Sequence, residues 1–132
     1  MKTASRSLGS VVAGAFLLLA GCNTVYTTHT QEIGGPEFPP SDPAKVEILR
    51  KEPTRPHIRL GEVRAEPSNE EVDAKKIEEA IRKEAAKIGA DAAVVIYDHT
   101  QITGEVVSGP WVGRTITPIE DRVIIAIAIK YQ

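Results

Sequence analysis

The side chains in this sequence that could carry chemistry are few. It holds one cysteine, Cys22, and three histidines, His29, His57 and His99. The histidines are far apart in the sequence, so a metal site would have to be assembled by folding. Asp98 precedes His99, but such a pair belongs more often to a turn than to a catalytic dyad. Gly-x-Gly-x-x-Gly, P-loop, His-Glu-x-x-His and Gly-x-Ser-x-Gly motifs are absent, so we expect no enzyme, metal or cofactor.

Residues 1–21 have the pattern of an export signal. Lys2 and Arg6 form a positive start, and the 13 residues Leu8–Ala20 follow without a charge. A helix of this length would reach about 20 Å, which is too short to span a hydrocarbon core of about 30 Å. We therefore predict a cleaved signal peptide.

The signal ends in Leu19-Ala20-Gly21-Cys22, which resembles the lipobox of bacterial lipoproteins. The resemblance implies cleavage between Gly21 and Cys22 and a diacylglyceryl group on the Cys22 thiol, which attacks as the thiolate. Asn23 follows, as in lipoproteins of the outer membrane. The implied protein is held by its N-terminal lipid to the outer membrane and faces the periplasm. The alternative is an ordinary secretory signal followed by an unmodified cysteine.

The charge balance argues against one class of partner. The chain has 132 residues, and loss of Lys2 and Arg6 with the signal would leave 14 basic and 18 acidic side chains, a net charge of −4. Because this chain is mildly acidic, lacks a Lys/Arg cluster and has few aromatic residues, we expect no nucleic-acid binding.

Residues 22–43 are predicted to form a tether between the lipid and a domain at 44–132. They show no hydrophobic periodicity, and Pro36, Pro39, Pro40 and Pro43 exclude a helix. The segment would be a spacer or simply a disordered N-terminus. Phe38, isolated between prolines, could instead dock onto the domain.

A helix is predicted at about 69–88. Ser68 and Glu71 have the spacing of a capping box, and Gly89 marks the C-terminal end. One face of this helix is apolar, and the other carries charged pairs at i,i+4 spacing. The apolar positions are Ile77, Ala80, Ile81, Ala85 and Ile88, and the pairs are Glu71–Lys75, Glu78–Arg82 and Glu79–Lys83.

Strands are predicted on both sides of the helix. Two strands precede the helix: a short one at 46–49 and one at 57–65, with a bulge at Gly61. After the helix, one strand is predicted at 92–97 and a last one at 122–131. Between these, two short strands are predicted within 101–117, on either side of a turn at 108–110. We expect the strands at 57–65 and 92–97 to be parallel, joined by the helix as a right-handed crossover. The predicted fold class is α+β: a small mixed β-sheet of about five strands with one long amphipathic helix, in the order β-β-α-β-β-β.

The last strand is apolar on both faces, whereas one helix can cover only one face of a sheet. We therefore predict a second face, carrying Ile124, Ala126 and Ala128, as a possible interaction surface together with Trp111. Three covers are open for it: the linker around Phe38, the 101–117 segment, or another protein chain. Trp111 is expected either to plug a gap in the packing or to be an exposed contact residue.

Lys83–Val95 runs from an amphipathic helix through Gly-Ala-Asp-Ala into a buried strand, and Arg55–Val63 forms the strand before it. These segments resemble a broad group of small bacterial envelope proteins, which includes uncharacterised lipoproteins, YbjQ-like domains and, more distantly, RcsF-like stress sensors. The resemblance covers roughly 46–97 and implies a fold but no catalytic residues. RcsF-like domains are held by disulfides, for which this sequence lacks the cysteines.

Two kinds of function follow from the sequence. The first is a protein-interaction or structural module that contacts another envelope protein or a second copy of the chain. The second is a periplasmic ligand- or metal-binding domain, which would need a pocket where His57, His99 or Asp98 converge.

Overall fold

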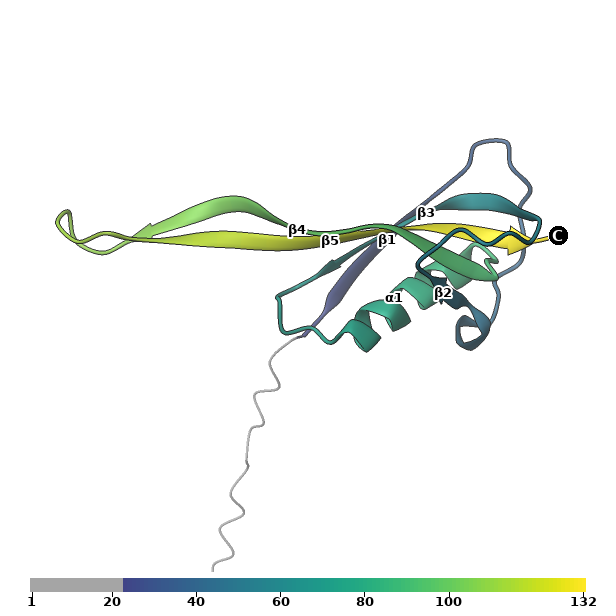
Figure 1. Cartoon of the computed structure of the whole chain (residues 1–132), viewed down its shortest axis with the longest axis horizontal. Coiled ribbons are helices and arrows are strands. Elements are labelled where there is room, and N and C mark those ends of the chain that lie inside the picture. The colour runs from purple at the N-terminus through teal and green to yellow at the C-terminus, as the bar shows by residue number, and fades with distance from the viewer. Residues whose placement is uncertain (1–22) are drawn as a thin grey trace, which may run out of the picture.

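The computed structural model describes residues 23–132 (Figure 1). The predicted signal peptide at 1–21, with its cleavage site at Gly21 and Cys22, lies outside the described residues. Five strands form one mixed sheet and a single long helix packs on it, which confirms the α+β class. The elements are β1 (Val25–Gln31), a 3₁₀ turn (Pro43–Lys45), β2 (Glu47–Leu49), β3 (His57–Pro67), α1 (Ala74–Lys87), β4 (Ala92–Ser108) and β5 (Thr115–Tyr131).

The order of the strands in the sheet is β1-β3-β5-β4-β2. Only β2 and β4 pair in parallel; the other neighbours are antiparallel. The predicted parallel relation of β3 and β4 is correct, but they are not neighbours, because β5 lies between them and is antiparallel to both. The expected bulge near Gly61 is present as a register shift between Arg59 and Gly61.

The predicted order β-β-α-β-β-β is wrong in two places. Val25–Gln31, assigned to the tether, is the edge strand β1, which pairs with β3 along its whole length. The region 101–117 does not form separate short strands: β4 continues unbroken to Ser108 and β5 starts at Thr115. The turn between them joins two long strands into one hairpin.

The helix starts later than predicted, at Ala74. Ser68 does not cap it, because the Ser68 hydroxyl accepts the N–H of Thr24 and the Ser68 N–H donates to Thr24 O, which extends the contact between the chains of β1 and β3. Asp73 is the N-cap and accepts the N–H of Lys75. Gly89 ends the helix with a φ of +78°, as predicted.

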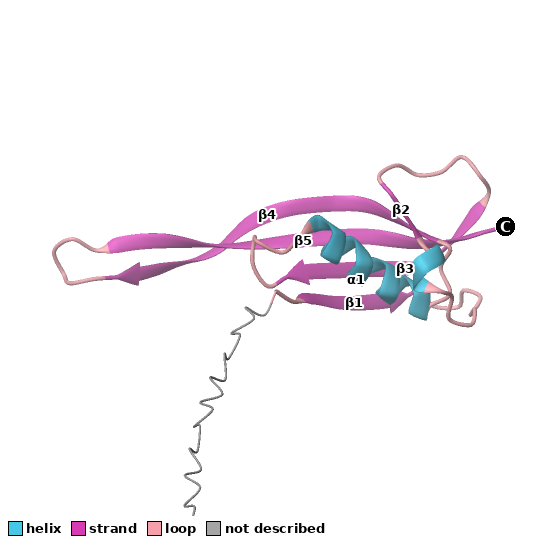
Figure 2. Cartoon of the chain, turned by 90° about the horizontal axis from the view of Figure 1, so that it is seen from below, coloured by secondary structure: helices cyan, strands magenta, loops and turns pink. Residues whose placement is uncertain are grey.

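One face of the sheet packs against α1 (Figure 2). Small side chains of the sheet lie beneath the helix, which brings Ile77 and Ile81 into the core. Burial of a side chain of this size contributes about 1.5–3 kcal/mol. Phe38 packs against the same core, so of the two alternatives left open for this residue the structure shows docking onto the domain.

The other face, which we call the outer face, carries a second buried cluster of Ala92, Val94, Ile127 and Ile129. Segment 50–56, between β2 and β3, lies over it, and the Arg55 guanidinium stacks 4.3 Å from the centre of the Tyr131 ring. This segment is not one of the three covers that the sequence leaves open. Over this cluster the outer face is covered within the chain, by a loop that has no hydrophobic pattern of its own.

A side chain at Gly61 is expected to destabilise the fold. A Cβ there would lie 1.9 Å from Thr30 O, on the backbone of β1. Gly61→Ala should therefore cost at least about 1–3 kcal/mol, as overpacking does. The matched control is Gly104→Ala, whose Cβ would meet only Ile119 Cδ1 at 3.5 Å. Thermal unfolding measures both, and equal melting temperatures would contradict the close approach of β1.

Candidate interaction site: the β4–β5 arm

The hairpin of β4 and β5 extends well beyond the rest of the sheet (Figure 1). Pairing of β3 with β5 ends at Ala65–Ile124, whereas β4 and β5 pair onward to Ser108–Thr115. We call residues 99–123 the arm. In the chain from residue 23 onward, no further strand pairs with this ribbon, so both of its long edges are open.

The arm exposes apolar side chains along most of its length. A two-stranded ribbon has no second layer to cover them, and such ribbons are only marginally stable alone in water. A surface of this kind in a folded protein indicates an interaction site. The exposed apolar residues are Ile102, Val106, Val107, Trp111, Val112, Ile116 and Ile119.

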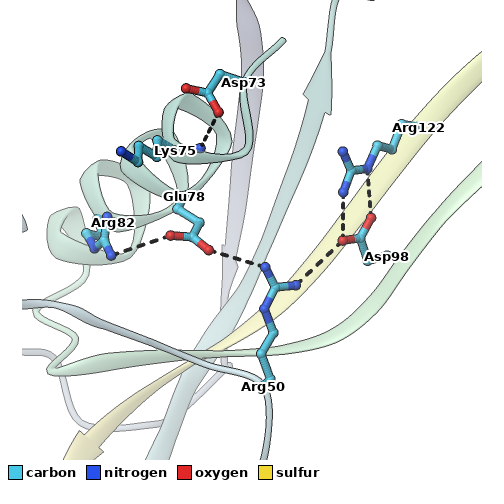
Figure 3. Close-up of polar contacts among 7 residues, drawn as sticks. All are labelled: Arg50, Asp73, Lys75, Glu78, Arg82, Asp98 and Arg122. Carbon is cyan, nitrogen blue, oxygen red and sulfur yellow. Dashed lines mark hydrogen bonds and ion pairs between the residues drawn. The ribbon is translucent and has the colours of Figure 1, made fainter. Parts of the chain in front are cut away.

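A chain of charged side chains fixes the arm where it leaves the domain (Figure 3). Arg122 on β5 donates two hydrogen bonds to the Asp98 carboxylate on β4, from Nε at 2.8 Å and Nη2 at 2.9 Å. Arg50 lies 3.6 Å from Asp98 and 3.2 Å from Glu78 on α1. Glu78 in turn lies 3.7 Å from Arg82. The root of the arm is thereby linked to β4, β5, segment 50–56 and the helix.

The electrostatics at the root of the arm favour the charged forms of Asp98 and Arg122. The hydrogen bond from Arg122 lowers the pKa of Asp98, against the raising effect of burial, and the Arg50 charge lowers it further. The pKa of Arg122 is raised by the same bond to Asp98. A bidentate, partly buried pair of this kind is the strong form of an arginine–carboxylate contact.

Acidic side chains cluster further out on the arm. Glu105 and Glu120 lie on one face of the ribbon, Glu120 meets Glu70 of the loop before α1, and Asp121 accepts a hydrogen bond from Thr103 at 2.7 Å. The hydrogen bond and charge of Glu70 raise the pKa of Glu120. We call Glu105, Glu120 and Asp121 the acidic band.

The sequence-predicted interaction surface is partly wrong. Ile124, Ala126 and Ala128 point to the helix side and are buried in the main core, because even-numbered positions of β5 face α1. The members of the opposite cluster that come from β5, Ile127 and Ile129, are at odd-numbered positions. Trp111 is no packing plug: it lies at the end of the arm, 84% exposed, with the Arg114 guanidinium 4.7 Å from its ring centre.

The histidines do not converge. His29 Nδ1 lies 2.6 Å from Glu84, and His99 packs edge-on against Tyr97. His57 pairs with Tyr131 and His99 with Val123, positions eight residues apart on β5, which is about 26 Å. Asp98 belongs to the root of the arm on the helix side. Among residues 23–132, no group of three His, Cys, Asp or Glu side chains could hold a metal ion.

His57 lines a cavity of about 390 Å³ between segment 50–56 and the outer face. Its Nδ1 donates to Arg55 O at 2.7 Å, and its Nε2 lies 3.3 Å from Glu52. The floor is apolar, from Val94, Ile127 and neighbouring side chains, and the rim is largely cationic, from Arg50, Lys51 and Arg59.

Comparison with known proteins finds a structure with a similar fold and no matching family. No model of a protein family matches the sequence, and no curated protein matches it. Among solved structures, the crystal structure of a Francisella virulence factor, FvfA, in its orthorhombic form is similar. The TM-score is 0.51 at 19% sequence identity, and the match covers 80% of this chain and 97% of that one. In the part of the chain that the structure describes, no helix is long and apolar enough to span a membrane.

The root of the arm is expected to weaken in acid. Because its folded pKa is lowered, ionised Asp98 stabilises the fold above its unfolded pKa of about 3.9, and this contribution is lost as the pH falls through the folded pKa. Asp98→Asn should cost about 1 kcal/mol at neutral pH. Thermal unfolding should give a constant difference from the native chain between about pH 7 and pH 5, shrinking below about pH 4. Glu79→Gln, which removes one partner of the exposed pair with Lys83, is the control and should change the melting temperature little at any of these pH values.

Proposed function

We propose that this chain is a lipid-anchored protein of the outer membrane, facing the periplasm, whose α+β domain is a protein-interaction module. The Leu19-Ala20-Gly21-Cys22 sequence supports the anchor. The observation that carries the interaction is the arm, which has two open strand edges and exposed apolar side chains on a firmly fixed root.

The part of the arm next to the root, residues 99–105 and 120–123, is the proposed contact for a protein partner. We call it the shaft. Its open backbone edges offer N–H and C=O groups to an added strand, while Ile102 and the acidic band supply side-chain contacts. A strand from another envelope protein fits this surface, and a strand from a second copy of the chain is the alternative source.

The cavity beneath segment 50–56 favours a second candidate function, a periplasmic ligand-binding domain. An apolar floor beneath Arg50, Lys51 and Arg59 suits a small anion with an apolar part. At about 390 Å³ this site lies at the small end of the range for ligand pockets, whereas the arm dominates the exposed apolar surface of the described chain. The interaction module is therefore the preferred function.

Removal of the Cys22 thiol is expected to release the protein from the membrane. Each buried CH₂ of an acyl chain contributes about 0.8 kcal/mol, so two or three chains make attachment effectively permanent. Cys22→Ala should move the protein from the membrane fraction, and intact mass should show lipid on the native chain only. A native chain that is soluble and carries no lipid would end the anchoring proposal.

A photo-crosslinking residue on the shaft is expected to capture one discrete partner in intact cells. Ile102 is the position of choice, because it is exposed on the shaft, and Lys83, exposed on the far side of α1, is the matched control. The expected result is one adduct at position 102 and none at position 83. An adduct of twice the chain's own mass identifies a second copy as the partner, and no adduct at position 102 contradicts a protein contact on the shaft.

A further inference from the structure

We propose that the end of the arm, residues 106–119, inserts into the phospholipid surface of the same membrane that carries the lipid on Cys22. We call this segment the tip. The inference rests on the proposed anchor and adds a second membrane contact to it. It concerns the tip alone, and the shaft stays available to a protein.

The composition of the tip differs sharply from that of the shaft. From Val106 to Ile119 there is no acidic residue, and Arg114 is the single charge. Six large apolar side chains are exposed here without a covering layer. They are Val106, Val107, Trp111, Val112, Ile116 and Ile119.

These side chains lie on both faces of the ribbon. Val107 pairs with Ile116 on one face, whereas Val106 pairs with Thr117 and shares the other face with Ile119. A protein surface packed on the ribbon would cover one face and leave the other in water. The membrane interface surrounds an inserted element on all sides and still offers headgroups and water to its open backbone edges, so the two-faced pattern favours an interfacial lipid contact.

The turn carries the residue types that suit a membrane interface. Trp111 and Val112 are each 84% exposed, and tryptophan is enriched where hydrocarbon meets headgroups. Arg114 stacks on the Trp111 ring, with 4.7 Å from its guanidinium carbon to the ring centre. A guanidinium held there can donate to a lipid phosphate while the ring and Val112 enter the acyl boundary.

The acidic band sets the depth of insertion. Glu105 lies three residues before Ser108, which is about 10 Å along the strand. Amphipathic helices that lie in a membrane interface are buried about 5–10 Å into the headgroup and acyl boundary, which is a depth similar to this length. Insertion of the tip therefore stops where Glu105, Glu120 and Asp121 would have to leave water.

The described chain begins, at Asn23, at the end of the domain from which the arm leaves. Asn23 O accepts a hydrogen bond from Lys76 in the first turn of α1, and β1 begins at Val25 opposite Pro67, just beyond the Ala65–Ile124 pair at the root (Figure 1). Cys22 directly precedes Asn23 in the sequence, so a lipid on Cys22 would enter the membrane at this end. Along β5, Thr115 at the outer end of the tip lies about 26 Å from Val123 at the root. Both contacts can then rest on one surface.

The experiment uses Trp111 as its reporter, because it is the only tryptophan of the chain. The full lipidated protein is placed in vesicles of phosphatidylcholine and phosphatidylglycerol, with or without bromine on the acyl chains. Flotation of the vesicles reports the anchor, and Trp111 emission reports the tip. We expect a blue-shifted emission that loses most of its intensity with brominated lipid and resists quenching by aqueous acrylamide.

Two variants test whether the change in Trp111 emission comes from insertion of the tip. Val112→Asp places a carboxylate beside Trp111 and should abolish quenching by brominated lipid without affecting flotation. Ile102→Asp likewise replaces an exposed apolar side chain by a carboxylate, but on the shaft, and should leave the quenching intact. Protein that floats while Trp111 stays open to acrylamide overturns insertion of the tip and leaves the anchor standing. A blue shift that depends on protein concentration and is the same with and without bromine also overturns insertion of the tip, in favour of a protein contact. Protein that does not float with the vesicles overturns the anchor and this inference together.

Discussion

β5 is longer than the sheet that supports it, and most of the structure follows from this mismatch. The strand has 17 residues, but β3 pairs only with its second half, from Ile124 onward. That half is buried on both faces and forms the spine of the core. The first half has only β4 beside it, so its side chains lie in water. Arg122 stands at the boundary, and its pair with Asp98 is the last tie before the ribbon becomes free.

A one-helix domain can bury a two-faced strand only if the two faces are covered by different means. Beneath α1 the sheet carries small residues such as Ala126 and Ala128, which let the helix approach closely. The outer face carries Ile127 and Ile129 instead, and segment 50–56 lies over them. Arg50 starts that segment and also bridges Glu78 and Asp98. Closure of the outer face and fixation of the arm are thus coupled through one side chain.

Local patterns predicted the helix, its i,i+4 pairs at Glu78–Arg82 and Glu79–Lys83, the bulge at Gly61 and the two-faced last strand. The edge strand β1 was missed because its inward positions are polar: Thr27 and His29 bond Glu84 rather than join an apolar core. Its β-branched and aromatic run, Val-Tyr-Thr-Thr, was the available signal. The sequence places the turn near Gly109 and Pro110 correctly, but it does not reveal the length of the arm, because Asp98-His99-Thr100 and Pro118 interrupt the apolar pattern of the two strands. Only pairing at long range shows that β4 and β5 continue together up to that turn.

The loss of the predicted tether changes what a lipid on Cys22 would do. Burial alone would raise the pKa of Glu84, but hydrogen bonds from Lys87, His29 and Thr27 lower it overall, so a charged carboxylate holds β1 to the helix. With β1 fixed from Val25, at most two residues separate Cys22 from the sheet. A lipid there cannot act as the end of a long spacer. It would place the root of the arm beside the membrane, so the direction of the arm, and not the length of a linker, decides what the domain can reach.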